Sequence, residues 1–292
     1  MASRSTHLSD LRRPNDKQKI REHYNAASPL YYELWGEHLH HGYWIKGYET
    51  KEAAQIQLVE HLARAAEIRS GQHILDVGCG FGASSIYLAK HLGVEATGVS
   101  ISEIQVSLAN RAARLQKAAA QFLVADAEAM SFDKSFDVVW SVESIAHYHD
   151  KRKFFASAAN LLKKNGLLAI TDWFQRESLS QPERERFIEP IQRAMFVELE
   201  TMPDYERWIR ASGLEIVRTE ILNEQCARTW DIALEIIKNR KLWRMATRRG
   251  PDFLPFLRGF RAVRAGYRSG TFVYGLIVAK KSALVTTRMS ES

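Results

Sequence analysis

The chain has 292 residues, and its hydrophobic fraction of 46% is enough to build a full core without disulfide or metal cross-links. Its two cysteines, Cys79 and Cys226, are too few for a disulfide framework and favour a reducing, cytoplasmic location. No apolar run reaches the roughly 18 residues of a membrane-spanning helix. The N-terminal residues lack the apolar stretch of a secretory signal.

Most of the net charge of +7 comes from a late basic segment, residues 240–268. Arginines are interleaved there with apolar side chains, namely Trp243, Phe253, Phe256, Leu257 and Phe260. This pattern is typical of amphipathic helices with solvated arginines, although weak contact with a membrane surface or binding of a diphosphate remains an alternative. No nucleic-acid-binding module accompanies the charge, so we expect no nucleic-acid partner.

The first half of the chain predicts alternating strands and helices after an N-terminal extension. Residues 16–27 predict a short helix, residues 31–47 a loop or irregular helix, and residues 51–68 an amphipathic helix. Strands are expected at 73–77, 95–100, 121–125, 136–142 and 167–171, and helices at 83–91, 102–117 and 151–162. Asn165 and Gly166 are expected to end the last of these helices. Such alternation indicates a parallel sheet covered by helices.

The second half breaks this rhythm. An inserted helix is expected at 181–199, a second helix at 203–211, a strand at 214–222, a basic helical region at 229–266 and a last strand at 271–280. We therefore predict an α/β fold, a seven-stranded Rossmann-like sheet with helices on both faces, an N-terminal helical cap and a helical lid. The boundaries are 1–50 for the arm and cap, 51–175 for the cofactor-binding core, 176–212 for the lid helices, 213–282 for the rest of the core with its basic insertion, and 283–292 for a disordered tail.

The segment LDVGCGFGAS joins the first strand to its helix and is the most informative stretch. Its glycines allow a tight turn and close approach to a ligand, and the following helix start offers free N–H groups. A dinucleotide-binding loop would fit, but the second strand ends at Ser100 without the acidic residue that such a site needs. Asp76, inside the strand, requires a cationic or hydrogen-bonding partner such as the ammonium of a methionine group. Asp126, after the third strand, can accept from an adenine amino group; backbone capping is the alternative for both.

Four segments in this order, LDVGCGFGAS, GVSIS, VADAE and FDVVWSVES, resemble the class I S-adenosylmethionine-dependent methyltransferases. YYELWGEHLHHGYW and AGYRSGTFVYGLIVAKK resemble the tocopherol and sterol C-methyltransferase branch and bacterial natural-product methyltransferases. In GVSISEIQ, as in that branch, a hydroxyl and a glutamine replace the usual ribose-binding acid. The resemblance implies S-adenosylmethionine as cofactor, contacted by Tyr24, Tyr31, His41, Asp76, Gly78, Gly80, Gly82, Ser100, Ser102, Gln105, Asp126, Ala127 and Val142.

Candidate catalytic residues follow the fourth and fifth strands, because ligands bind beyond the carboxyl ends of strands in such sheets. Glu143 and His147 are candidates for a general base or for positioning the acceptor. Asp172 matches an acidic residue that some relatives use beside that histidine, with a cap or an ion-pair role as the alternative. Ala146 stands where the antibiotic-sugar branch often has a histidine, which argues against sugar O-methylation.

Aromatic and histidine residues crowd the expected cap. Tyr24, Tyr31, Trp35, Tyr43 and Trp44 are candidates to face the sulfonium, with simple packing as the alternative for each. Three cap histidines occur in EHLHHG, but their spacing matches no zinc pattern, so we expect no metal. Contact between a cap histidine and the carboxylate of the cofactor is the preferred interpretation.

These observations predict a methyltransferase for a hydrophobic small-molecule acceptor. The first hypothesis is C-methylation of a prenylated aromatic or isoprenoid compound in secondary metabolism. The second is O- or N-methylation of a natural product on the same cofactor site. A non-enzymatic, adenosyl-binding scaffold subunit is the third, and a homo-oligomer formed through the N-terminal helix is left open.

Overall fold

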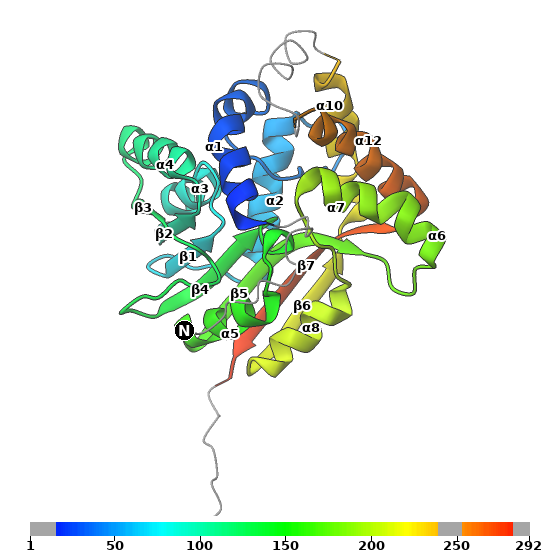
Figure 1. The fold of residues 1–292 in the computed structure, drawn as a ribbon. Helices are drawn as coiled ribbons and strands as arrows, with labels where there is room; N and C mark the ends of the chain where they lie inside the picture. Colours follow the sequence, from blue (N-terminus) through cyan, green and yellow to red (C-terminus); the bar gives the residue numbers. More distant parts are fainter. Residues whose placement is uncertain (1–15, 239–252, 283–292) are drawn as a thin grey trace, which may run out of the picture.

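The computed structural model describes residues 16–238 and 253–282. The arm before residue 16, the middle of the basic segment and the tail 283–292 lie outside the described residues, so the expectations for them are not addressed. At the centre is a seven-stranded sheet in the order β3-β2-β1-β4-β5-β7-β6 (Figure 1). Its strands are β1 His73–Val77, β2 Glu95–Ser100, β3 Ala120–Val124, β4 Phe136–Val142, β5 Leu162–Gln175, β6 Leu214–Ile221 and β7 Phe272–Lys281.

Strands β1 to β5 pair in parallel, whereas β7 is antiparallel to both of its neighbours, β5 and β6. The predicted α/β fold with seven strands is confirmed. Side chains alternate between the two faces of the sheet. Along β1, for example, Ile74 joins one hydrophobic core while Leu75 and Val77 join the other.

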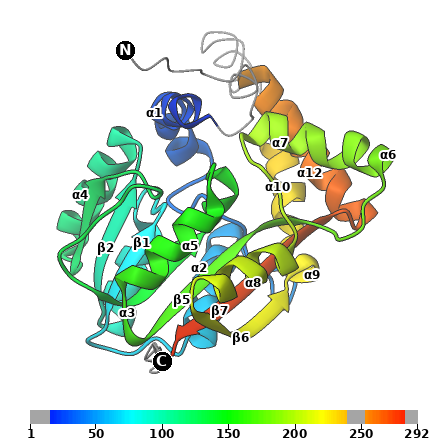
Figure 2. The ribbon, with the colours of Figure 1, turned by 60° about the horizontal axis from the view of Figure 1, so that its bottom comes forward.

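Helices cover both faces (Figure 2). Helix α2, Lys51–Ala65, and helix α3, Ala83–Leu92, pack on one face through side chains such as Leu58, Leu62 and Leu88. Helix α5, Lys151–Leu161, and helix α8, Met202–Ala211, pack on the other through Phe155 and Tyr205. Helix α4, Glu103–Gln116, packs along β3.

The remaining helices gather at one end of the sheet. They are α1 Lys17–Leu34, α6 Gln181–Glu183, α7 Glu189–Met195, α9 Asn223–Cys226, α10 Arg228–Ile236 and α12 Phe253–Ser269. Figure 1 shows α1, α7, α10 and α12 grouped above the sheet. Ala27 and Leu30 of α1 share a small apolar cluster with Ile237 and Leu257, so the cap and the lid touch each other as well as the core.

Several predicted boundaries are wrong, among them the end of the first helix and the start of the fifth strand. Helix α1 runs on to Leu34, through Pro29, so Tyr31 is helical rather than in a loop. The apolar cluster with α10 and α12 compensates for the hydrogen bond that Pro29 cannot make. Strand β5 starts at Leu162, not at 167, because Leu162 already pairs with Phe136. The register between β4 and β5 then shifts across the segment that contains Asn165, and regular pairing resumes at Leu167 with Val138.

The expected helix over 181–199 is divided. After α6 the chain forms a π-helical turn, Arg184–Ile188, in which the Glu189 N–H donates to the Arg184 carbonyl, and α7 follows. Pro190 lies in the first turn of α7 and has no N–H to continue an α-helical ladder across the junction. Helix α7 then ends at Phe196, whose φ of 56° is left-handed.

The glycine loop supplies a stability test. A Cβ at Gly82 would lie 2.4 Å from the Phe122 ring, whereas a Cβ at Gly71 would meet nothing within 4 Å, and both glycines have positive φ. We expect Gly71→Ala to cost about 1 kcal/mol from backbone strain alone. Gly82→Ala should cost a further 1–3 kcal/mol, roughly, because the ring must move in a packed core. Urea unfolding midpoints measure both; equal losses would contradict the packing argument.

Candidate active site

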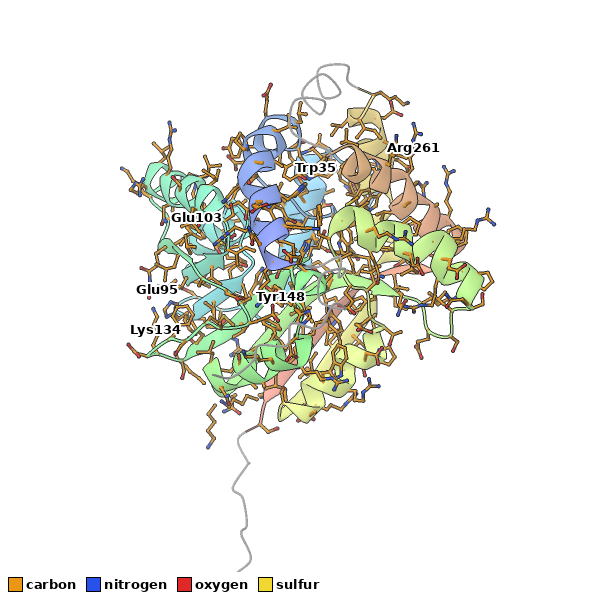
Figure 3. The ribbon with its side chains drawn as sticks, in the orientation of Figure 1. Trp35, Glu95, Glu103, Lys134, Tyr148 and Arg261 are labelled. Carbon is orange, nitrogen blue, oxygen red and sulfur yellow. The ribbon has the colours of Figure 1, made fainter. Side chains whose placement is uncertain are left out.

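A cavity of about 270 Å³ lies between the strand ends and the helices grouped above them. Its floor is formed by residues that follow β1, β2, β3 and β4, such as Gly78, Ile101, Ala125 and Glu143. Its roof comes from α1, α7, α10 and α12. Figure 3 marks two of the lining residues, with Tyr148 below α1 and Trp35 above.

The glycine loop forms one part of this lining, through Gly78 and Gly80. Asp76, which also lines the cavity, is buried and accepts from Ser85 Oγ at 2.6 Å through Oδ2. Burial raises the pKa of Asp76 to about 7, although the Ser85 hydrogen bond opposes the shift. A buried acid of this kind is suited to meeting a cationic group, which would stabilise its charged form.

The turn after β2 lies next to this loop. Ser100 Oγ donates to Gln105 Oε1 at 2.8 Å, and both residues line the cavity. Ser102 is outside the lining: its hydroxyl caps α4 by accepting from the Gln105 N–H and donates to Asn25 Oδ1 of α1. The Gln105 side chain turns to Ser100 and so makes no reciprocal capping contact with the Ser102 N–H among the described contacts.

The region after β3 carries an ion-pair cluster. Lys17 Nζ, at the start of α1, lies 2.8 Å from Asp126 Oδ2 and 2.8 Å from Glu128 Oε2. Asp126 also accepts from the Glu128 N–H, so the capping role that was the alternative for this residue is present in the structure. Ala127 lines the cavity beside them. Helix α1 is therefore tied to the floor by charge.

Glu143, directly after β4, is the most heavily bonded side chain of the cavity. Oε1 accepts from the His41 backbone N–H at 2.6 Å and from Tyr274 Oη at 2.8 Å. Oε2 accepts from Trp173 Nε1 at 2.8 Å and lies 3.0 Å from His41 Nδ1. Trp230 Nε1 of α10 donates to His41 Nε2 at 2.7 Å, so the ring proton of His41 is on Nδ1 and points to the carboxylate.

We call this group, Glu143 with His41, Trp173, Tyr274 and Trp230, the Glu143 clasp. Burial on its own would raise the pKa of Glu143, but its interactions with His41 outweigh burial and lower this pKa to about 2. Both oxygens of Glu143 are engaged by these donors, so neither is left to take a proton from an acceptor. The two ring nitrogens of His41 are both engaged, so its ring has no nitrogen left for a cofactor carboxylate.

His147 has a different environment. It lies in the short 3₁₀ turn Ile145–His147, and its Nδ1 donates to the Phe196 carbonyl at 2.9 Å. Because a carbonyl can only accept, the unprotonated nitrogen is Nε2, which lies 3.1 Å from Tyr24 Oη of α1. Burial lowers the pKa of His147 to about 4, only partly opposed by the Phe196 hydrogen bond. A neutral imidazole with an accepting nitrogen therefore lines the cavity.

Asp172 is fully buried away from the cavity. Its Oδ2 accepts from Tyr205 Oη of α8 at 2.9 Å, and burial raises its pKa to about 7. The structure therefore places this sequence-predicted catalytic residue between β5 and α8 and not beside His147.

Of the sequence-predicted site residues, the cavity lining brings together Tyr24, Tyr31, His41, Asp76, Gly78, Gly80, Ser100, Gln105, Asp126, Ala127, Val142, Glu143 and His147. Gly82, Ser102 and Asp172 lie outside it. The sequence analysis missed Lys17, Trp230 and Tyr274. Trp230 and Tyr274 meet His41 and Glu143 across 189 and 131 residues of sequence, a distance that no local pattern reveals.

Across the described residues, no group of three His, Cys, Asp or Glu side chains is placed to hold a metal ion. Within the same residues, no helix has both the length and the apolar character needed to cross a bilayer.

Comparison with known proteins identifies the family. The model of the family described as mycolic acid cyclopropane synthetase matches residues 11–248. The chain belongs to this family. It is an S-adenosylmethionine-dependent methyltransferase, as the order of its motifs implies.

Two curated relatives match most of the chain. It is 29% identical to the chloroplastic tocopherol O-methyltransferase of Arabidopsis thaliana, over 91% of this chain and 82% of the relative. It is 32% identical to the 27-O-demethylrifamycin SV methyltransferase of Amycolatopsis mediterranei, over 92% of this chain and 97% of the relative.

Among solved structures, the mycolic acid cyclopropane synthase CmaA1, complexed with SAH and CTAB, has the same fold. Its TM-score is 0.81 at 19% identity, over 90% of this chain and 98% of that one.

For this member of the family, the Glu143 clasp predicts a specific defect. We expect Glu143→Gln to lower the free energy of unfolding by about 2–4 kcal/mol. The NH2 group of the glutamine can only donate, so it would face an N–H or O–H donor without forming a hydrogen bond. Hydrogen exchange at residues 38–44 should accelerate. Glu49→Gln is the control, since Glu49 also accepts from backbone N–H groups of the cap loop, at Ile45 and Lys46, but does not line the cavity. An equal effect of both changes would refute the clasp.

Proposed function

We propose that this methyltransferase moves the methyl group of S-adenosylmethionine to a hydroxyl oxygen of a hydrophobic small molecule, with His147 as general base. The observation that carries the proposal is the pairing of His147 Nε2 with a hydroxyl, that of Tyr24, inside the cavity. The Phe196 carbonyl fixes the tautomer and the ring orientation. An acceptor hydroxyl that takes the place of the Tyr24 hydroxyl would lose its proton to Nε2.

The cofactor residues that we infer follow the order of the strands. Asp76, with the Gly78 and Gly80 backbone, would hold the methionine end, and Asp76 fits this role as a buried acid with a raised pKa. Ser100 and Gln105, already paired, would hold the ribose, and Asp126 with Ala127 the adenine. When bound, the cofactor supplies an electrophilic methyl group on a sulfonium.

The remaining work of the site is to orient the acceptor and exclude water. The roof of the cavity is apolar; its residues include Leu30, Leu34, Met195, Trp230, Ala233, Ile236, Leu257 and Phe260. Such walls favour an acceptor with a large apolar body. They also remove water from the space between the incoming hydroxyl and the methyl donor.

Oxygen is favoured over carbon by the rifamycin relative, whose name describes an O-demethyl substrate. Transfer to a ring carbon of a phenol, our sequence-based hypothesis, is the second candidate, since deprotonation by His147 would also activate the ring. An acceptor from secondary metabolism fits the rifamycin relative.

Incubation of the purified enzyme with methyl-labelled S-adenosylmethionine and a panel of hydrophobic phenols tests the proposal. We expect release of S-adenosylhomocysteine and a new methyl signal at the carbon shift of an O-methyl group. A signal at the shift of a methyl on a ring carbon would replace the first candidate by the second. Lack of turnover and of cofactor binding would refute both.

The role of His147 predicts an unusual pH profile. Because its pKa is about 4, His147 is neutral above that pH, and kcat/KM should stay constant from pH 7 to about 5 and fall as the ring is protonated. If the base were a histidine with an ordinary pKa, kcat/KM would fall to half its plateau value near pH 6.5. His147→Asn should lower kcat by about a hundredfold or more with little change in the affinity for S-adenosylhomocysteine. His149→Asn, at an exposed neighbour, is the control; equal losses would exclude His147 as the base.

A further inference from the structure

The ionisable side chains of the cavity are mostly acidic. Among the described residues, the lining holds the carboxyl groups of Glu37, Asp76, Asp126, Glu128 and Glu143 but one ammonium, that of Lys17, and no arginine. Lys17 is already paired with both Asp126 and Glu128. The cavity therefore has no uncommitted side-chain cation within the described part of the chain to meet an acidic group on the acceptor.

The five histidines of the lining do not change this balance. His41 is engaged at both ring nitrogens, by Glu143 and by Trp230. Burial lowers the pKa of His23 and of His147 to about 4, and it also lowers those of His38 and His40. Near neutral pH these four rings are uncharged and provide no cation for an anionic ligand.

The N–H and O–H donors around Glu143 are also committed. Glu143 takes those of Trp173, Tyr274 and His41, and His41 takes that of Trp230. Glu143 is thus a permanent negative charge in the wall, and its donors cannot turn to a second anion without leaving it buried and unpaired.

The basic residues of the late segment that the structure describes point elsewhere. Helix α12 contributes Leu257 and Phe260 to the cavity, whereas Arg258, Arg261 and Arg268 are exposed (Figure 3 labels Arg261 on the outer side of the helix). Arg264 forms an ion pair with Asp231. Within the described part of this segment, no basic side chain lines the cavity; the rest of the segment lies outside the described residues.

We propose that the acceptor pocket selects against charge: it takes hydrophobic hydroxyl compounds that are uncharged, and it rejects those that carry a carboxylate, phosphate or diphosphate. This inference rests on the proposed function for the identity of the acceptor site. An anion in this pocket would lose its hydration beside a fixed carboxylate and would gain no unpaired cation from the part of the lining that the structure describes.

The test compares ligands that share one apolar tail. The enzyme, saturated with S-adenosylhomocysteine, is titrated by calorimetry with para-nonylphenol, para-nonylbenzoate and para-nonylphenyl phosphate. We expect the phenol to bind about a hundredfold more tightly than either anion, since an unpaired buried charge is that costly. Anion binding within tenfold of the phenol, or failure of the phenol to bind, would overturn the proposal.

A matched pair of variants supplies a gain-of-binding test. Ile236 of α10 lines the cavity, whereas Ile232, one turn earlier and also half-buried, does not. Ile236→Lys should reduce the ratio of the phenol affinity to the phosphate affinity at least tenfold. Ile232→Lys should leave this ratio unchanged. The same shift in both variants, or in neither, would contradict a pocket controlled by charge. Thermal unfolding verifies that both variants are folded, and the wild-type titrations are decisive if one is not.

Methyl transfer is assayed separately, so the two claims can fail independently. Selective binding of the phenol without methylation would refute the proposed function and leave the charge selectivity standing. Methylation of the phenol together with equal binding of the anions would do the reverse.

Discussion

The organisation of the site depends on one buried carboxylate. Glu143 follows β4 with a left-handed φ of 55°, a conformation that costs a side-chain-bearing residue about 1–3 kcal/mol. The donors around it come from the cap loop, from β5 and from β7, and through His41 also from α10. Elements that are remote in the chain are therefore held at one point by the need to pair a single charge.

Glu143 and His147 both lie at the end of β4, but they have different roles. Glu143 is charged and fully bonded, so it holds the walls in place. His147, four residues later, is neutral and presents an accepting nitrogen, so it is the group able to take a proton. Pairs of titratable groups whose environments push their pKa values apart mark such a division of roles. Here burial acts on both, and the difference lies in how many donors each one meets.

Much of the core and of the cofactor loop was predictable, because strands β1, β2 and β4 and the glycine turn are specified by local patterns. Gly82, Ser102 and Asp172 show the limit of motif reasoning, since each has a suitable residue type yet serves packing, helix capping or a buried hydrogen bond. The Glu143 clasp was not predictable as a unit. His41, Trp230 and Tyr274 become neighbours only through long-range packing. The division of the expected 181–199 helix was also not predictable, because the hydrophobic pattern does not change at the junction where Pro190 lies.

The place of β7 has a consequence for biosynthesis. Although β7 follows the other six strands of this sheet in the sequence, it lies inside the sheet, between β5 and β6, and its Tyr274 donates to Glu143. A growing polypeptide on the ribosome therefore carries β6 without a neighbour and Glu143 without one of its donors until residue 274 has left the exit tunnel. The pocket therefore cannot be completed before β7 has been synthesised and has entered the sheet.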